Sequence, residues 1–166
     1  MRVEVELAGL DKRVRQIAAA SKPCWHLMSV PGVGPLTSLA FLSPVEDPQR
    51  FGKSRSIGSY IGLTPKRYQS GDRDVTGSIT KQGDDMLRHY LYEAAGCLLT
   101  TVTAPSALRS WGLRLAKRLG PKPARTAVAR KLAVLLLGLW KREDHFPRRA
   151  ERQGILETEI VEFVRR

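Results

Sequence analysis

Hydrophobic positions recur in alternating steps of four and three near the start of the chain. Val3, Leu7, Leu10, Val14 and Ile17 stand at heptad positions on an otherwise polar segment. This spacing is typical of a coiled-coil helix. Two heptads are short for a free-standing coiled coil, so the seam either packs on its own domain or pairs with a second helix.

Apolar positions with helical spacing predict further helices downstream. Breaks are expected at residues 21–24 and at Asp47-Pro48, and Gly120-Pro121 separates the last two helices. A cap is expected near Ser54, and another at Asp84 or Asp85. The predicted fold is mainly α, a small helical domain with helices over residues 35–42, 54–63, from 84 or 85 to about 98, 106–119 and 124–142.

Residues 64–83 differ from their surroundings. They are polar, hold three glycines and show no apolar helical face. A stretch of this length inside a compact domain is usually functional or disordered. The sequence therefore predicts a long polar loop, with a small hairpin as the alternative.

Composition narrows the class of protein. The 166 residues suit one domain, and 28 Lys and Arg against 16 Asp and Glu give a net charge of +12. No apolar run approaches the roughly 18 residues that cross a bilayer, the first residues do not resemble a secretory signal, and two cysteines make no disulfide framework. We expect a cytoplasmic, soluble protein with a polyanionic partner and no membrane association.

The basic residues are concentrated late in the chain. Residues 94–142 hold ten Lys or Arg and no Asp or Glu. A solvated helix face normally mixes both signs, so this run favours a surface that follows phosphates. The residues expected to bind nucleic acid here are Arg109, Arg114, Lys117, Arg118, Arg130 and Lys131.

A glycine-containing turn precedes the first predicted apolar helix. Val-Pro-Gly-Val-Gly-Pro at residues 30–35 resembles the turn of helix-hairpin-helix modules, where backbone amides approach a DNA phosphate. Gly32 and Gly34 are therefore candidate phosphate contacts. The alternative is a tight turn between helices without a ligand.

The polar stretch contains hydroxyl groups among cations. Nearby cations would stabilise both an alkoxide and the charge of a phosphorane, so a serine here could attack a phosphodiester. By residue type alone, Ser-Gly is more often just a turn. The residues concerned are Ser70 and Ser78, with Lys66, Arg67, Arg73 and Lys81 as the surrounding cations.

Metal ligands are not evident in the sequence. Asp72, Asp74, Asp84 and Asp85 cluster along one short stretch, whereas a two-metal site draws on separate elements. The three histidines have no partner at ligand spacing. We expect no metal or other cofactor bound by this chain.

Five short motifs occur in a fixed order. They continue into Leu87-Arg88 and into Ala-Arg-Lys-Leu-Ala at residues 129–133. Together they resemble, over about residues 25–146, the carboxy-terminal domain of serine-dependent insertion-sequence transposases related to the Piv invertase, a group that includes bridge-RNA-guided recombinases. The motifs are Pro-Gly-Val-Gly (31–34), Asp-Pro-Gln-Arg-Phe (47–51), Tyr-Ile-Gly-Leu-Thr-Pro (60–65), Ser-Gly (70–71) and Gly-Ser-Ile-Thr-Lys-Gln-Gly (77–83).

The resemblance implies a division of the chain and of its chemistry. Full-length members carry an amino-terminal RuvC-like domain with acidic ligands, where Mg²⁺ is expected, and then a coiled-coil connector. Residues 1–24 would be the end of the connector, 25–146 the carboxy-terminal domain and 147–166 a charged tail. The RuvC-like domain is then missing, so we expect the isolated chain to be catalytically incomplete.

The resemblance also assigns roles. Ser70 corresponds to the family nucleophile, with Ser78 in reserve. DNA is the expected partner, a guide RNA is a further candidate, and the amino-terminal helix would join a second copy or an intact transposase. Two other interpretations stay open: a truncated remnant that only binds nucleic acid, and a helix-hairpin-helix repair protein that would not need residues 66–82.

Overall fold

The computed structural model describes the backbone of residues 2–70 and 73–146, and the side chains of residues 3–66 and 77–146. The charged tail expected at 147–166 lies outside this part. The elements are α1 (Arg2–Ala20), α2 (Lys22–Met28), α3 (Pro35–Val45), the 3₁₀ turn η1 (Pro48–Arg50), α4 (Ser56–Tyr60), β1 (Pro65–Ser70), β2 (Arg73–Ile79), α5 (Asp85–Thr100), α6 (Ala107–Leu119) and α7 (Pro121–Arg142). The mainly helical fold expected from the sequence is confirmed.

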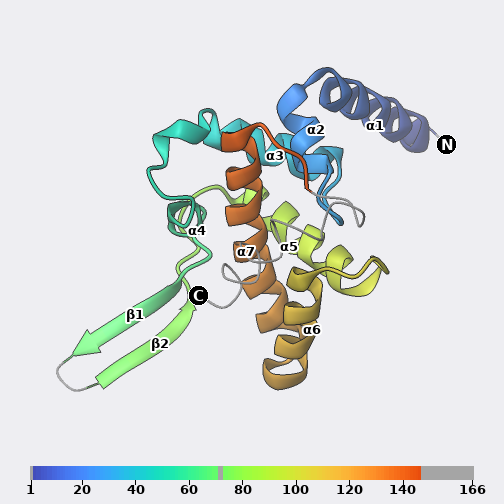
Figure 1. Ribbon diagram of the computed structural model, residues 1–166. Coiled ribbons are helices and arrows are strands. Elements are labelled where there is room, and N and C mark those ends of the chain that lie inside the picture. The colour runs from blue at the N-terminus through green and yellow to red at the C-terminus, as the bar shows by residue number, and fades with distance from the viewer. Residues whose placement is uncertain (1, 71–72, 147–166) are drawn as a thin grey trace.

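Helix α7 runs through the middle of the molecule (Figure 1). Helices α5 and α6 pack along it, α4 contacts it from another side, and α3 packs on α5. The ring of Phe41 on α3 meets Trp140 of α7 edge-on, with centroids 6.4 Å apart. The side chains of α7 that are fully removed from water are Ala124, Val128, Ala129, Leu132, Ala133, Leu136 and Leu137, so this helix carries the largest part of the hydrophobic core.

Local chemistry explains where the later helices begin. The Asp84 carboxylate accepts a hydrogen bond from the Leu87 amide at 2.6 Å, and the Ser106 hydroxyl caps α6 through the Arg109 amide at 3.1 Å. Each satisfies an amide that has no partner within the helix. Helix α7 begins at Pro121, three residues earlier than expected, because proline is well tolerated in a first turn.

Two local expectations were wrong. The break expected over residues 21–24 is confined to Ser21, and α2 follows at once with Pro23 in its first turn, where no amide is needed. Helix α4 begins at Ser56 rather than Ser54 and has no side-chain cap.

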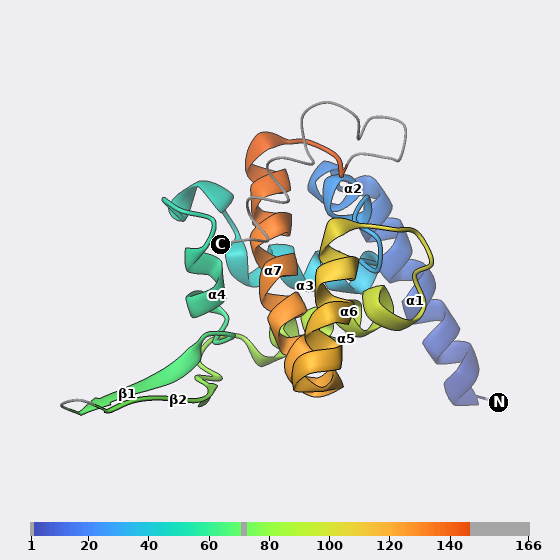
Figure 2. The same cartoon turned by 60° about the horizontal axis from the view of Figure 1, so that its bottom comes forward.

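The expected long polar loop is mostly a β-hairpin. β1 and β2 are antiparallel, pairing Pro65 with Ile79 and Ser70 with Arg73, with an irregularity after Pro65. Figures 1 and 2 show the hairpin projecting away from the helices. At the base of the hairpin, Ile79 packs against the hydrophobic core.

Helix α1 extends from the body at its other side (Figure 2). Its last turns contact α2 and α3: Ala18 is buried, and the Trp25 indole donates to the Ala19 carbonyl at 2.8 Å. The heptad positions that we call the α1 seam (Val3, Leu7, Leu10, Val14 and Ile17) remain largely uncovered, with Leu7 60% exposed. None of the helices in the described ranges is long and apolar enough to cross a membrane.

Candidate nucleic-acid interface

The serine expected to be the nucleophile lies at the outer end of the hairpin. Ser70 is the last residue of β1, and its strand partner Arg73 is the first residue of β2. The hairpin places this end away from the helical body (Figure 2). The side chains of Ser70, Arg67 and Arg73 lie outside the described part of the structure, so their roles stay predictions.

An arginine of α5 holds the base of the hairpin. The Arg88 guanidinium donates from Nη1 to the carbonyl oxygens of Ile61, at 3.0 Å, and Gln82, at 3.3 Å. Its Nη2 pairs with the Asp85 carboxylate, and the side chain is only 12% exposed. Arg88 thus ties the segments before and after the hairpin to one helix. Arg88 belongs to the motif series in the sequence, but this role could not be predicted because its hydrogen bonds go to backbone atoms.

The two hairpin arms are also joined by their backbones. The Lys81 amide donates to the Gly62 carbonyl at 3.0 Å, and the Thr80 amide to Thr64 at 2.9 Å. Gly62 and Gly83 have φ of +71° and +88°. A Cβ on Gly83 would stand 2.1 Å from the Tyr60 carbonyl oxygen, so this close crossing requires glycine.

The two glycines of the turn between α2 and α3 have different surroundings. Gly32 has φ of +89°, and a Cβ there would come within 2.9 Å of the Ala94 carbonyl oxygen on α5. Gly34 caps α3 and has open space around it, while its carbonyl accepts from Ser38. Packing therefore explains the glycine at position 32. Phosphate contact at either glycine stays a prediction.

The basic residues of α6 and α7 occupy different surroundings. Arg114, Lys117 and Arg118 are exposed on α6, whereas Arg109 is half-buried and its Nε has no hydrogen-bond partner among the described atoms. Lys131 of α7 stands over the Trp111 ring, 5.6 Å from its centroid. The exposed α6 cations are thus placed to meet a polyanion in solution.

Two further cations of this run support the fold. Arg125 lies over the Tyr92 ring, 5.4 Å from its centroid, and fills the space beside Gly96. The Lys141 ammonium donates to the Phe51 carbonyl. Their positive charge is therefore used within the molecule, at least in part, and we do not add them to the interface.

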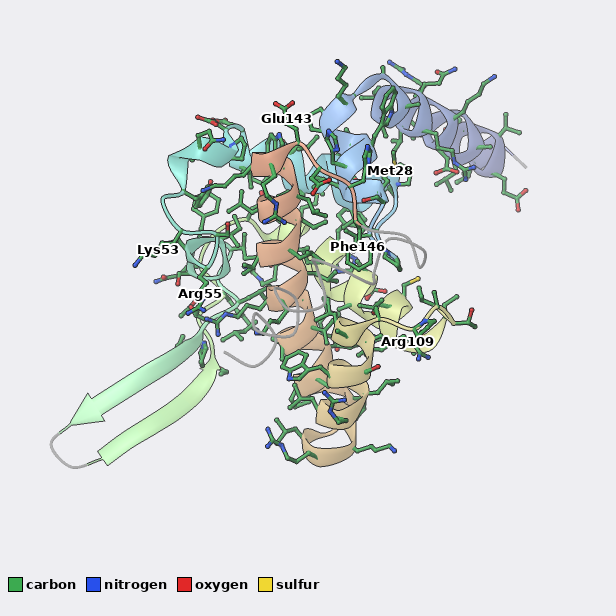
Figure 3. All side chains as sticks on the ribbon, viewed as in Figure 1. Met28, Lys53, Arg55, Arg109, Glu143 and Phe146 are labelled. Atoms are coloured by element: carbon green, nitrogen blue, oxygen red, sulfur yellow. The ribbon has the colours of Figure 1, made fainter. Side chains whose placement is uncertain are left out.

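A pocket of about 810 Å³ opens between α4, the hairpin base, α6 and α7. We call it the basic pocket. Its polar lining brings together Arg130 and Lys131, both expected from the sequence, with the reserve candidate Ser78. Thr126 and two further cations, Arg55 and Lys122, also line it. Lys122 belongs to the basic run of residues 94–142 but was not among the expected contacts. Arg55, which Figure 3 labels where α4 meets the hairpin base, was missed because no pattern links residues so far apart.

The electrostatics of the basic pocket favour an anion. Burial lowers the pKa of the Lys131 ammonium from its ordinary value of 10.5, and Arg55 and Arg130 lower it further. The described residues that line it include no Asp or Glu. Bringing these cations together costs free energy, which a bound anion would offset.

The described side chains hold no group of three His, Cys, Asp or Glu residues that could bind a metal. His26 and His145, far apart in the sequence, do meet, with ring centroids 4.5 Å apart. The Nδ1 of His26 is buried, with no hydrogen-bond partner among the described atoms. This pair joins α2 to the segment after α7, where the Phe146 amide also donates to Ser29 at 2.7 Å.

Comparison of the sequence with known proteins identifies the family of this chain. Residues 24–110, more than half of the chain, match the model of the Transposase IS116/IS110/IS902 family. The chain is 34% identical over 137 residues to the transposase for insertion sequence element IS1111A of Coxiella burnetii, covering 82% of this chain and 38% of that protein. It is 27% identical over 142 residues to a probable family 20 transposase of Pseudomonas aeruginosa, covering 85% of this chain and 42% of that protein. The chain spans about two fifths of the length of these relatives, and it belongs to the Transposase IS116/IS110/IS902 family.

Proposed function

We propose that this chain supplies the DNA-binding and nucleophile-bearing part of an insertion-sequence transposase. In this proposal the Ser70 hydroxyl oxygen attacks a DNA phosphorus. The P–O3′ bond breaks, the hydroxyl proton passes to a base, and the 3′ oxygen leaves with a proton as a free hydroxyl. The serine then carries the 5′ phosphate, and attack by another 3′ hydroxyl releases it and joins the exchanged strand.

The position of Ser70 carries this proposal. It ends a strand that projects from the helical body, so a phosphate can approach it without displacing any helix (Figure 1). Arg73, its strand partner, is the nearest candidate for stabilising the transition-state charge. Lys66 and Lys81 near the hairpin base, with Arg67, would extend this positive field along the strand.

Ser78 differs from Ser70 in position. It lies near the end of β2 and lines the basic pocket at the base of the hairpin. A phosphate held there would meet fixed helices, which suits binding better than strand exchange. We therefore assign Ser78 to binding and Ser70 to nucleophilic attack.

The rest of the reaction requires more than this chain. We propose that Mg²⁺ is held by an acidic, RuvC-like domain elsewhere in the full-length protein, and that a guide RNA selects the DNA. The Gly34 turn and the exposed cations of α6 would grip the nucleic-acid backbone, because such contacts position a duplex without reading its sequence.

The α1 seam supports a proposal about assembly. Four of its five apolar positions are exposed in the described structure, Val14 is half-buried, and the heptad spacing is complementary to a second copy of the same helix. We propose that α1 pairs with α1 of a second chain. Such pairing would bring two hairpins into one complex, as strand exchange between two DNA sites requires.

The test is covalent capture. The purified chain is incubated with Mg²⁺, a supercoiled plasmid carrying a matching element end and candidate guide RNA, with and without a separately supplied RuvC-like domain. We expect a DNA adduct at Ser70, seen by denaturing gel and mass spectrometry, that disappears in Ser70→Ala and persists in Ser78→Ala. An adduct that survives Ser70→Ala refutes the nucleophile. Tight, salt-sensitive binding without any adduct would leave the chain as a nucleic-acid-binding remnant.

A further inference from the structure

The basic pocket has a cationic side and an apolar side. Arg55 comes from the residue before α4, Lys122 from the first turn of α7, and Arg130 and Lys131 from two turns further along α7. Four positive groups from two elements converge on a concave surface that also includes the Ser78 hydroxyl. Such a set offers both charge and hydrogen-bond donors to a phosphate.

Three of these four cations have no carboxylate partner among the described side chains. None of Arg55, Lys122 and Arg130 forms an ion pair among the described residues. The stem of Arg130 lies against Gly58, where a Cβ would stand 3.0 Å from its Nε, so this side chain is positioned by packing rather than by a carboxylate. The charges are therefore held in place and available to an external anion.

The apolar side accounts for the rest of the lining. Trp111 is half-buried, and Leu119, which is 53% exposed, reaches the same pocket from the end of α6. Ile79, Pro123 and Val134 complete this wall. Ligand pockets are typically lined by hydrophobic and aromatic side chains and measure about 300–1,000 Å³.

We infer that the basic pocket binds one unpaired nucleotide of a DNA strand, with its phosphate at the cations and its base against the wall formed by Trp111 and Leu119. A duplex backbone would satisfy the cations alone, because stacked bases cannot reach an apolar wall. A base that has left the stack reaches it, and aromatic side chains bind such bases with little sequence preference.

This inference rests on the proposed function and deepens it. The pocket adjoins the base of the hairpin whose outer end carries Ser70, so a nucleotide held there would fix a displaced strand relative to the reacting one. The pocket would thus stabilise the opened DNA that strand exchange needs.

The experiment measures binding by the whole chain and needs no catalysis. Fluorescence anisotropy is recorded with a labelled mixed-sequence single-stranded DNA, its duplex, and a single-stranded RNA of the same sequence, over a range of salt. The variants are the double Arg55→Gln/Lys122→Gln, Trp111→Leu and Trp111→Phe. The double variant Lys12→Gln/Arg13→Gln removes two exposed cations of α1, far from the pocket, and is the matched control for charge.

The double variant Arg55→Gln/Lys122→Gln should lower the slope of log affinity against log salt by up to about 0.7 on the single strand, since the pocket holds one phosphate and each phosphate contact contributes about 0.7. Trp111→Leu should weaken single-strand binding about tenfold and duplex binding much less, whereas Trp111→Phe keeps most of the affinity. Arg55 and Lys122 are exposed, so their variants should fold even if Trp111→Leu does not.

Several results would overturn the inference. If Arg55→Gln/Lys122→Gln binds the single strand as the control Lys12→Gln/Arg13→Gln does, the cations of the pocket do not bind a phosphate. If folded Trp111→Leu loses equal affinity for single strand and duplex, the apolar wall does not bind a base. RNA bound more tightly than DNA, with the same losses in the variants, would replace DNA as the occupant. Failure of the wild-type chain to bind any of the three probes would instead count against the proposed function itself.

Discussion

Removing the guanidinium of Arg88 should loosen the hairpin that carries Ser70. In Arg88→Met the side chain keeps its length and its apolar stem, but the hydrogen bonds to Ile61 and Gln82 are lost. These two carbonyls lie on the segments that enter and leave the hairpin. We therefore expect the hairpin base to open more often, while the helical core is unchanged.

The size of the effect follows from the geometry. A hydrogen bond from a charged donor typically contributes about 1.5–3 kcal/mol. Both bonds come from one nitrogen and the second is long, so their loss should cost about 2–4 kcal/mol rather than twice the upper figure. The Asp85 partner is 93% exposed, and its ion pair adds less than about 1 kcal/mol. If opening is global, Tm should fall by about 5–15 °C.

Two measurements separate local from global opening. Thermal unfolding reports the whole domain, and amide hydrogen exchange at Thr80 and Lys81 reports the bonds that close the hairpin base. Arg13→Met, which removes an exposed arginine of α1, is the control. Exchange at Thr80 and Lys81 that is equally slow in both variants, with equal Tm, would refute the assignment of Arg88 as the residue that anchors the hairpin.

Three further predictions follow from single positions. Gly83→Ala forces a Cβ against the Tyr60 carbonyl at a positive φ and should destabilise the domain by more than about 1–2 kcal/mol in chemical denaturation. Gly52→Ala, at a position with open space, should match the wild type. Equal losses in the two variants would contradict the close contact between Gly83 and Tyr60. Leu7→Lys in the α1 seam should convert a dimer to a monomer in light scattering, and Val5→Lys, exposed but outside the heptad, should not. The pKa of Lys131 is lowered in the fold, so between the folded pKa and 10.5 the unfolded chain binds more protons than the folded one. The free energy of unfolding of the wild type, relative to Lys131→Met, should therefore rise as the pH increases from neutrality through this window. A difference that does not change with pH in chemical denaturation would contradict the burial of this charge.

The helices could be foreseen because their signals are local. Asp84 caps α5 and Ser106 caps α6, as the position of a short polar residue before an apolar periodic run predicts. The exposed α1 seam shows the limit of this reasoning. The heptad predicted a helix, but whether its apolar face would be covered depended on contacts that the spacing does not encode.

The hairpin and the basic pocket depended on long-range contacts. Strands of residues 65–79 contain Lys, Gln, Asp and Gly, which are poor strand formers, so their polarity suggested a loop. Their pairing is supported by the crossing at Gly62 and by the Arg88 bonds, which join distant segments. Arg55 likewise enters the pocket only because α4 packs on α7. Neither the hairpin anchoring nor the approach of Arg55 to α7 corresponds to a periodic pattern in the sequence.

The one-signed charge of residues 94–142 links stability to function. Folding brings Arg130 and Lys131 close to Arg55, and the lowered pKa of Lys131 shows that this proximity is unfavourable to its charged form. Stability alone would favour a carboxylate there, yet none is present among the described residues that line the basic pocket. A ligand that binds only the folded state stabilises it. A phosphate in this pocket would therefore both reduce the repulsion among these cations and raise the free energy of unfolding. If DNA binds in this pocket as proposed, the cations that weaken the free domain would stabilise its folded state in the complex. The order of the α4–α7 contact and of the adjoining hairpin base would then depend on the DNA on which Ser70 is proposed to act.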